Sequence, residues 1–301
     1  MFRQLLSLAM VIGMTIPCIS NAASNNWHQR GLNDELVTPA DIAAEIVFGR
    51  AIAARILGKH IAYANPALVR YISLVGNTLA QSSNRPELEF HFLILDTDEL
   101  NSYAAPGGYI FISTGTIKLL KDESELAGVL AHEIAHITER QVVKKLDVKG
   151  ANDTSTLALF LGGKTAAARN AFVYAADGAA STAGGSNSAA RATFGKKIEQ
   201  GFQLIYQDKY EREDELQAVT TSVFISVLSG YDPLGLARYL NRIKPIKENS
   251  ATMPGNTTLS IDNRVAQIND VIAIECVDDC VLATNINRFD EEMKSLRPSP
   301  F

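Results

Sequence analysis

The residues best suited to chemistry form one short run, His132-Glu133-Ile134-Ala135-His136, which matches the pattern H-E-x-x-H. On an α-helix, two residues four apart point about 40° from each other and lie one turn apart, so both imidazoles can reach one ion. Glu133 points about 100° away from His132, where its carboxylate can contact a water on that ion without binding the ion itself. The pattern predicts a hydrolase site with one Zn²⁺ per chain.

Each residue type in this run has a chemical task. Zinc lowers the pKa of bound water to about 7 and polarises a carbonyl group. A carboxylate then accepts the water's proton and passes it to the leaving amine. We therefore expect His132 and His136 to bind the metal. Glu133 is expected to be the catalytic base that assists attack of zinc-bound water on a peptide bond.

A catalytic zinc takes three protein ligands and leaves a fourth position to water. The other histidines, His28, His60 and His91, all precede the motif, and none belongs to a second recognisable ligand motif. The third ligand should therefore be a carboxylate. Glu139 lies on the same helix but about 10 Å along the axis from His132, too far to share one ion. A glutamate of a second helix is required.

That second helix is expected over residues 202–229 and carries Glu211, Glu213 and Glu215. Glu215 lies one turn before the small Ala218, which would let this helix pack closely against the zinc helix. Glu211 lies four residues earlier on much the same face and is the alternative, whereas Glu213 points elsewhere.

The elements that position these residues are mainly helical. Capping residues and periodic apolar positions predict helices that begin after Thr38, Asn65, Asp122 and Asp232, and another helix in the tail after Asp262. Alternating apolar residues predict two strands, over residues 88–95 and 109–112. The expected fold class is therefore α+β, mainly helical, with a small β-sheet beside the H-E-x-x-H helix.

The first residues indicate export. Arg3 precedes an apolar run over residues 5–19, and small residues then stand at −3 and −1 of a cut after Ala22. The run is shorter than the roughly 20 residues that a membrane span needs. Residues 1–22 are therefore expected to be a signal peptide, and the mature chain, without a transmembrane segment, is expected in the periplasm.

Other features define the rest of the chain. Cys276 and Cys280 are expected to form a disulfide in an oxidising compartment. The net charge of −5 gives no indication of the basic surface that nucleic-acid-binding proteins use. A metallopeptidase domain is expected over residues 36–301. Its parts are N-terminal helices at 36–85, the sheet and zinc helix at 86–145, a flexible Ala/Gly-rich insertion at 150–200, and the Glu-ligand helix with C-terminal helices at 201–301.

Three motifs together resemble metallopeptidase family 48. They are N-S-Y-A-A-P-G-G-Y-I-F at residues 101–111, D-E-S-E-L-A-G-V-L-A-H-E-I-A-H at 122–136 and G-Y-D-P at 230–233, and the resemblance spans residues 36–270. It implies a zincin-like fold of the gluzincin type and the activity of a zinc endopeptidase. It also implies that Glu215, as the first glutamate of an E-x-x-A-D motif, is the third zinc ligand.

The chain departs from the family pattern at two places. Val219 stands where the family has the aspartate of E-x-x-A-D, and a carboxylate there could orient a metal ligand. Thr258 stands at the histidine of a late H-P-x-x-x-x-R motif, whose arginine matches Arg264. The first departure predicts weaker metal binding or activity, and no role of the missing histidine can be transferred.

The resemblance also implies a substrate role for residues 101–111, as an edge strand that pairs with an extended peptide. Asn101, Gly107, Gly108 and Tyr109 are the substrate-binding candidates, and a purely structural hairpin is the alternative. The expected substrates are unfolded or misassembled envelope proteins, with envelope-assembly proteins as partners.

The alternative function is a weakly catalytic, zinc-containing chaperone or scaffold of the envelope, suggested by Val219 and Thr258. Glu133 argues against it, because a purely structural zinc site has no use for a base.

Overall fold

The computed structural model describes residues 37–149, 188–208, 210–248, 259–275, 283–294 and 296. The expected signal peptide, Cys276, Cys280 and Thr258 lie outside these residues, as do residues 150–187 of the expected insertion. None of the helices in the described ranges combines the length and the apolar composition needed to cross a bilayer.

A three-stranded sheet divides the molecule into two layers. Its strands are β1 (His91–Leu95), β2 (Ser102–Ala105) and β3 (Tyr109–Ser113), in the order β1-β3-β2. β1 runs parallel to β3, and β2 runs antiparallel to it, so β2 forms one edge of the sheet. The prediction of two strands omitted β2 as a strand of its own, because its Ser and Ala residues have little intrinsic strand preference.

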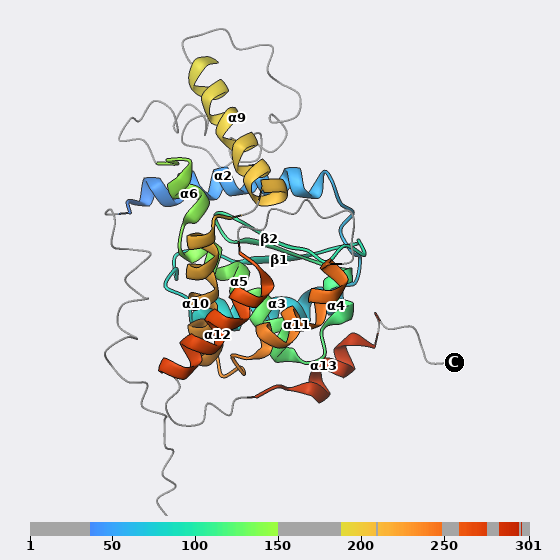
Figure 1. Cartoon of the computed structure of the whole chain (residues 1–301). Coiled ribbons are helices and arrows are strands. Elements are labelled where there is room, and N and C mark those ends of the chain that lie inside the picture. Colours follow the sequence, from blue (N-terminus) through green and yellow to red (C-terminus); the bar gives the residue numbers. More distant parts are fainter. Residues whose placement is uncertain are drawn as a thin grey trace, which may run out of the picture.

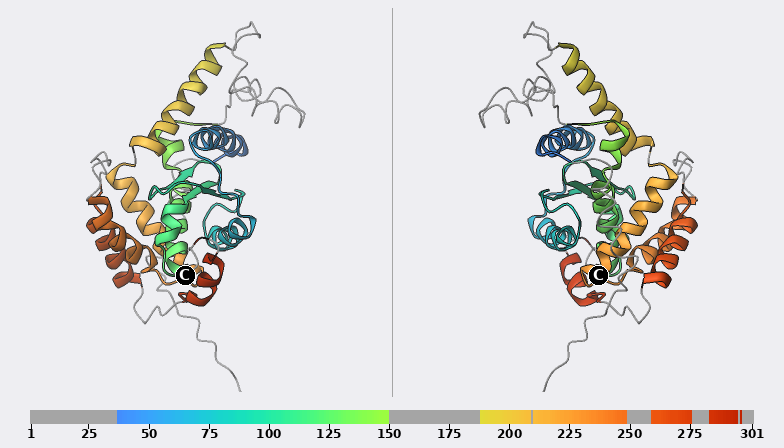
Figure 2. Two further views of the ribbon diagram at one scale, coloured as in Figure 1. Left: turned by 90° about the vertical axis from the view of Figure 1, so that its right-hand side faces the viewer. Right: turned by 90° about the vertical axis from the view of Figure 1, so that its left-hand side faces the viewer.

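Helices cover both faces of the sheet (Figures 1 and 2). On one side lie α2 (Pro39–Leu57) and α9 (Ser188–Gln203), and on the other lie α3 (Pro66–Gln81) and α5 (Glu123–Thr138). Alternation along β3 serves both layers, since Ile110 and Ile112 join the core with α3 and α5, while Phe111 joins the core with α2. The mainly helical α+β fold is thus confirmed.

The predicted helix starts are correct where a side chain caps the first turn. Thr38 and Asp41 form a reciprocal capping box at the start of α2. Asn65 accepts a hydrogen bond from the Leu68 N–H at 3.1 Å. Asp122 accepts one from the Glu125 N–H at 2.8 Å and begins the helix that carries H-E-x-x-H.

The remaining elements surround α5. They are α4 (Thr114–Leu119), α6 (Gln141–Lys145), the π-helical turn η1 (Leu204–Asp208), α10 (Arg212–Leu228), α11 (Gly235–Glu248), α12 (Ile261–Glu275) and α13 (Ile286–Met293). Every residue of α5 is buried, and α5 packs most extensively on α10 and α11.

The prediction of one helix over residues 202–229 is wrong at its start. α9 ends at Gln203, η1 follows, and α10 begins only at Arg212. Tyr210, in the break, is buried in the layer that contains α2. The break redirects the chain from α9, which extends away from the sheet in Figure 2, to α10 beside α5. Residues 188–200 of the expected insertion belong to α9.

Candidate metal centre

His132 and His136 from α5 and Glu215 from α10 converge at one point. The two Nε2 atoms lie 3.2 Å apart, and Nε2 of His132 lies 3.5 Å from Oε2 of Glu215. One donor atom from each of the three residues lies within 4.8 Å of the other two. All three side chains are buried. Within the described ranges, this is the one such convergence of His, Cys, Asp and Glu side chains.

The donor set fits a zinc ion. Two imidazole nitrogens and a carboxylate oxygen form a common set of protein ligands for catalytic zinc. Buried polar atoms are normally hydrogen-bonded, yet Oε2 of Glu215 has no hydrogen-bond partner among the described residues. This oxygen has ion-pair contacts with His132 and Arg264 at 3.5 and 3.3 Å, and a metal cation bound there would be a closer partner.

The charge states suit the same role. Burial, together with the neighbouring His132, lowers the pKa of His136 to about 3, so its imidazole is neutral at pH 7. Burial opposes ionisation of Glu215, but His132 and Arg264 outweigh it and hold the pKa of that carboxyl well below its usual range. A neutral imidazole and an ionised carboxylate are the forms that bind a metal.

The competing glutamates lie elsewhere. Glu211 precedes α10 on the surface and accepts a hydrogen bond from the Lys145 ammonium at 2.5 Å. Glu139 caps the end of α5 and accepts hydrogen bonds from the side chains of Gln217 and Thr221 at 2.7 and 2.6 Å. Of the four candidates considered, only Glu215 lies at the two histidines.

Glu133 is buried beside the same site, and its carboxylate is held by a residue that is not among the predicted site residues. Oγ of Ser102, on the edge strand β2, donates a hydrogen bond to Oε1 of Glu133 at 2.7 Å. Burial raises the pKa of Glu133, which increases its affinity for a proton. The only sequence signal for Ser102 was its position next to Asn101.

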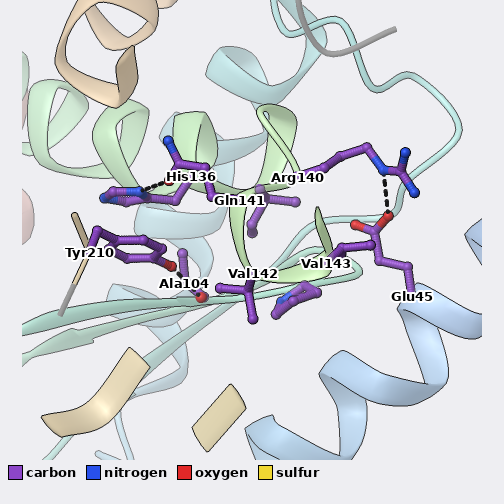
Figure 3. Close-up of a pocket in the computed structure, with 10 residues that line it drawn as sticks. Glu45, Ala104, His136, Arg140, Gln141, Val142, Val143 and Tyr210 are labelled. Atoms are coloured by element: carbon purple, nitrogen blue, oxygen red, sulfur yellow. Dashed lines mark hydrogen bonds and ion pairs between the residues drawn. The ribbon is translucent and has the colours of Figure 1, made fainter. Parts of the chain in front are cut away.

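Three further contacts surround the ligands. The ring of Tyr210 stacks on His136, with centroids 3.8 Å apart and planes inclined by 9°. Nδ1 of His136 lies 2.6 Å from Oε1 of Gln141 (Figure 3). Arg264 on α12 lies 3.3 Å from Oε2 of Glu215. A small cavity next to His136 is lined by Glu45, Ala104, Pro106, Ile137, Arg140, Gln141, Val142, Val143 and Tyr210.

Residues 66–272 of the chain match peptidase family M48. The chain belongs to this family.

Curated relatives carry related names. The chain is 29% identical to the β-barrel assembly-enhancing protease of Escherichia coli K12 over 154 residues, which cover 49% of this chain and 31% of that protein. It is 36% identical over 83 residues to the protein of that name from Yersinia pestis, covering 28% and 17%. It is 32% identical over 76 residues to the mitochondrial metalloendopeptidase OMA1 of Schizosaccharomyces pombe, covering 25% and 23%. The chain thus spans less than a third of each.

M48 membership confirms the expected family and the expectation of a metallopeptidase. The departure from its pattern at Val219 concerns a buried position on α10. Val219 is fully buried one turn after Glu215, and Nδ1 of His132 is buried without a hydrogen-bond partner in the described part of the chain. A carboxylate from α10 would be a suitable acceptor for this nitrogen.

The predicted substrate-binding residues of the M48 chain lie at the start of β2 and at the turn between β2 and β3. Asn101 precedes Ser102 at the sheet edge, and its side chain donates to Glu99 at 3.0 Å. Gly107 and Gly108 form the turn between β2 and β3, both with φ in the left-handed region, and the Gly107 N–H donates to Glu45 on α2. Tyr109 accepts a hydrogen bond from Arg50, also on α2. The turn is thus anchored to α2.

Proposed function

We propose that this chain is a zinc-dependent endopeptidase that hydrolyses peptide bonds of unfolded or misassembled envelope proteins. The observation that carries the proposal is the convergence of His132, His136 and Glu215 beside the buried carboxylate of Glu133. Membership of M48 supports it, and the bacterial relatives are named for β-barrel assembly, which supports an envelope protein as substrate. The proposed location is the periplasm. The proposed catalytic residue is Glu133, and the proposed ligands are the other three.

Zinc held by these ligands would supply Lewis-acid polarisation of the scissile carbonyl and a more acidic water. Glu133 performs the proton transfer. Its Oε1 is fixed by Ser102, and its raised pKa gives it affinity for the proton of the attacking water. It then passes this proton to the nitrogen of the leaving amine, which would otherwise depart as an unstable anion.

The edge strand β2 is the proposed binding surface for an extended substrate. The Ser113 N–H donates to the Asn101 carbonyl, so this pair faces inward across the β2–β3 ladder. In an antiparallel pair the next residue, Ser102, directs its main-chain groups away from the partner strand. An extended peptide that pairs there would lie next to the residue that holds Glu133.

The alternative of a weakly catalytic chaperone or scaffold is less well supported. A purely structural zinc site has four protein ligands and needs no base. Here the second buried carboxylate beside the site, that of Glu133, is hydrogen-bonded to Ser102 of the edge strand and does not join the three proposed ligands.

The test compares the wild-type chain with Glu133→Gln on an unstructured casein-like substrate. Glutamine cannot accept the proton, so we expect hydrolysis to fall by a factor of about 10² or more while zinc stoichiometry stays near one. Envelope proteins retained by Glu133→Gln then identify the substrates. Equal activity of the two forms would remove Glu133 as the base.

A further inference from the structure

We infer that Gln141 is a positioning residue of the metal centre, which orients His136 and ties it to the main chain beside Glu215. The inference rests on the proposed zinc site. Gln141 is not part of H-E-x-x-H, and its side chain is buried directly behind the second histidine (Figure 3).

The hydrogen bonds of the Gln141 amide define its orientation. Its Nε2 donates to the carbonyl oxygen of Asp214 at 2.7 Å. Because a carbonyl oxygen can only accept, the NH₂ group must face Asp214 and the amide oxygen must face His136. Nδ1 of His136 therefore carries the hydrogen and donates to Oε1 at 2.6 Å. This tautomer leaves the Nε2 lone pair free on the side of His132 and Glu215.

A left-handed turn at Arg140 makes this contact possible. On a continuous helix, residues five apart point about 140° from each other and do not meet. α5 ends before Arg140, whose φ of 57° is uncommon for a residue with a side chain. The turn brings Gln141 back to His136. Arg140 lies 3.5 Å from the buried carboxylate of Glu45, which also binds Arg85 at 3.0 Å, so buried charges hold the turn (Figure 3).

The same amide joins the two ligand-bearing helices. Asp214 immediately precedes Glu215, so one side chain is bonded both to a histidine ligand and to the main chain next to the carboxylate ligand. Tyr210 covers a face of the His136 ring. His136 is thus fixed at its edge and its face, whereas Nδ1 of His132 lacks a partner in the described ranges. The orientation of the site depends chiefly on the His136 side.

The experiment measures the zinc Kd of the full chain by competition with a chelator. Gln141→Leu keeps the approximate size of the side chain but offers neither hydrogen bond. We expect its Kd for zinc to rise about 10–100-fold, as is usual when a ligand loses such a partner. The zinc-loaded protein, labelled with ¹⁵N-histidine, should also lose the protected Nδ1–H resonance of His136.

Gln217→Leu is the matched control. Gln217 also joins α10 to the end of α5, through a 2.7 Å hydrogen bond from its side chain to Glu139, which is not one of the proposed ligands. Its zinc Kd should stay within about threefold of wild type. Gln141→Glu retains an acceptor for Nδ1 and should retain the Nδ1–H resonance, which keeps the test decisive if the leucine variant fails to fold.

Three results would overturn the inference: a wild-type Kd for Gln141→Leu, an equal loss of affinity in Gln217→Leu, or loss of the resonance in Gln141→Glu. All three results are read on a chain whose wild-type form binds zinc. A wild-type chain that binds none would overturn the proposed function itself, and the two failures are therefore distinguishable.

Discussion

Ser102 on β2 donates a 2.7 Å hydrogen bond to Glu133 on α5, and this contact links the edge of the sheet to the proposed base. The main chain of Ser102 faces outward from β2, and its side chain faces the zinc helix. Ser102 can therefore fix the position of a peptide paired with β2 relative to the Glu133 carboxylate, which accepts the proton of the attacking water.

Replacing Ser102 tests this link. Ser102→Ala removes the hydrogen bond and leaves the three proposed ligands intact, so we expect kcat to fall about tenfold, the equivalent of about 1.4 kcal/mol, with zinc content unchanged. Ser102→Thr keeps a hydroxyl and should retain most of the activity. Steady-state peptidase assays with metal analysis decide the matter, and a wild-type kcat in Ser102→Ala would contradict the expectation.

The third ligand is tested by a pair of glutamates one helical turn apart. Glu215→Gln should lower zinc occupancy and abolish hydrolysis, because the amide is a poor zinc ligand. Glu211→Gln should keep a stoichiometry near one, since Glu211 lies on the surface with Lys145. Metal analysis of the purified variants distinguishes the two residues. The reverse pattern would assign the ligand role to Glu211.

Supplying an acceptor at position 219 should strengthen metal binding. Val219 follows Glu215 by one turn, and Nδ1 of His132 has no partner in the described part of the chain. We expect Val219→Asp to lower the zinc Kd about tenfold, by orienting His132. The metal-free variant should unfold more readily, because the new carboxylate is buried. Val219→Ala, which offers no acceptor, should show no gain in affinity, and a gain there would refute the explanation.

Glu123 predicts how stability depends on pH. Its buried carboxylate accepts hydrogen bonds from Tyr71 at 2.7 Å, Tyr231 at 2.9 Å, Asn285 at 3.0 Å and Arg288 at 2.5 Å. Burial opposes ionisation, but the hydrogen bonds from Arg288 and the tyrosines outweigh it and lower the pKa of Glu123. A lowered pKa stabilises the fold above the unfolded-state value of about 4.3 and loses this effect as the pH falls through the folded-state pKa.

Glu123→Gln should therefore reduce the free energy of unfolding by about 2–4 kcal/mol at pH 7. The difference from wild type should begin to shrink below about pH 4, where the unfolded-state carboxyl takes up a proton, and should be lost only as the pH falls through the lowered folded-state pKa. Denaturant titrations at several pH values measure this. Glu291→Gln, which alters an exposed ion pair with Lys294, is the control and should change stability by less than about 1 kcal/mol. A difference independent of pH would contradict the assignment.

Local signals allowed much of the fold to be predicted. Thr38, Asn65 and Asp122 each begin a helix where expected, because a cap acts on N–H groups within three residues of itself. Gly230, with φ of 80°, ends α10 for the same local reason. The spacing of His132 and His136 sufficed to place both on one face of a helix.

The rest depended on how the elements cross. Apolar alternation did not predict the strand β2, which exists through pairing with β3, and only the family resemblance indicated an edge strand there. The break before α10 was missed because apolar periodicity does not reveal where a helix changes direction. The contact between Ser102 and Glu133 requires the edge strand to pass over α5. That between Gln141 and His136 requires a left-handed residue that no local preference predicts. The spacing of the motif determined that His132 and His136 share the metal-binding face of one helix. Only tertiary packing decided which other side chains hold the site residues in position, because these contacts join residues that local chain geometry does not bring together.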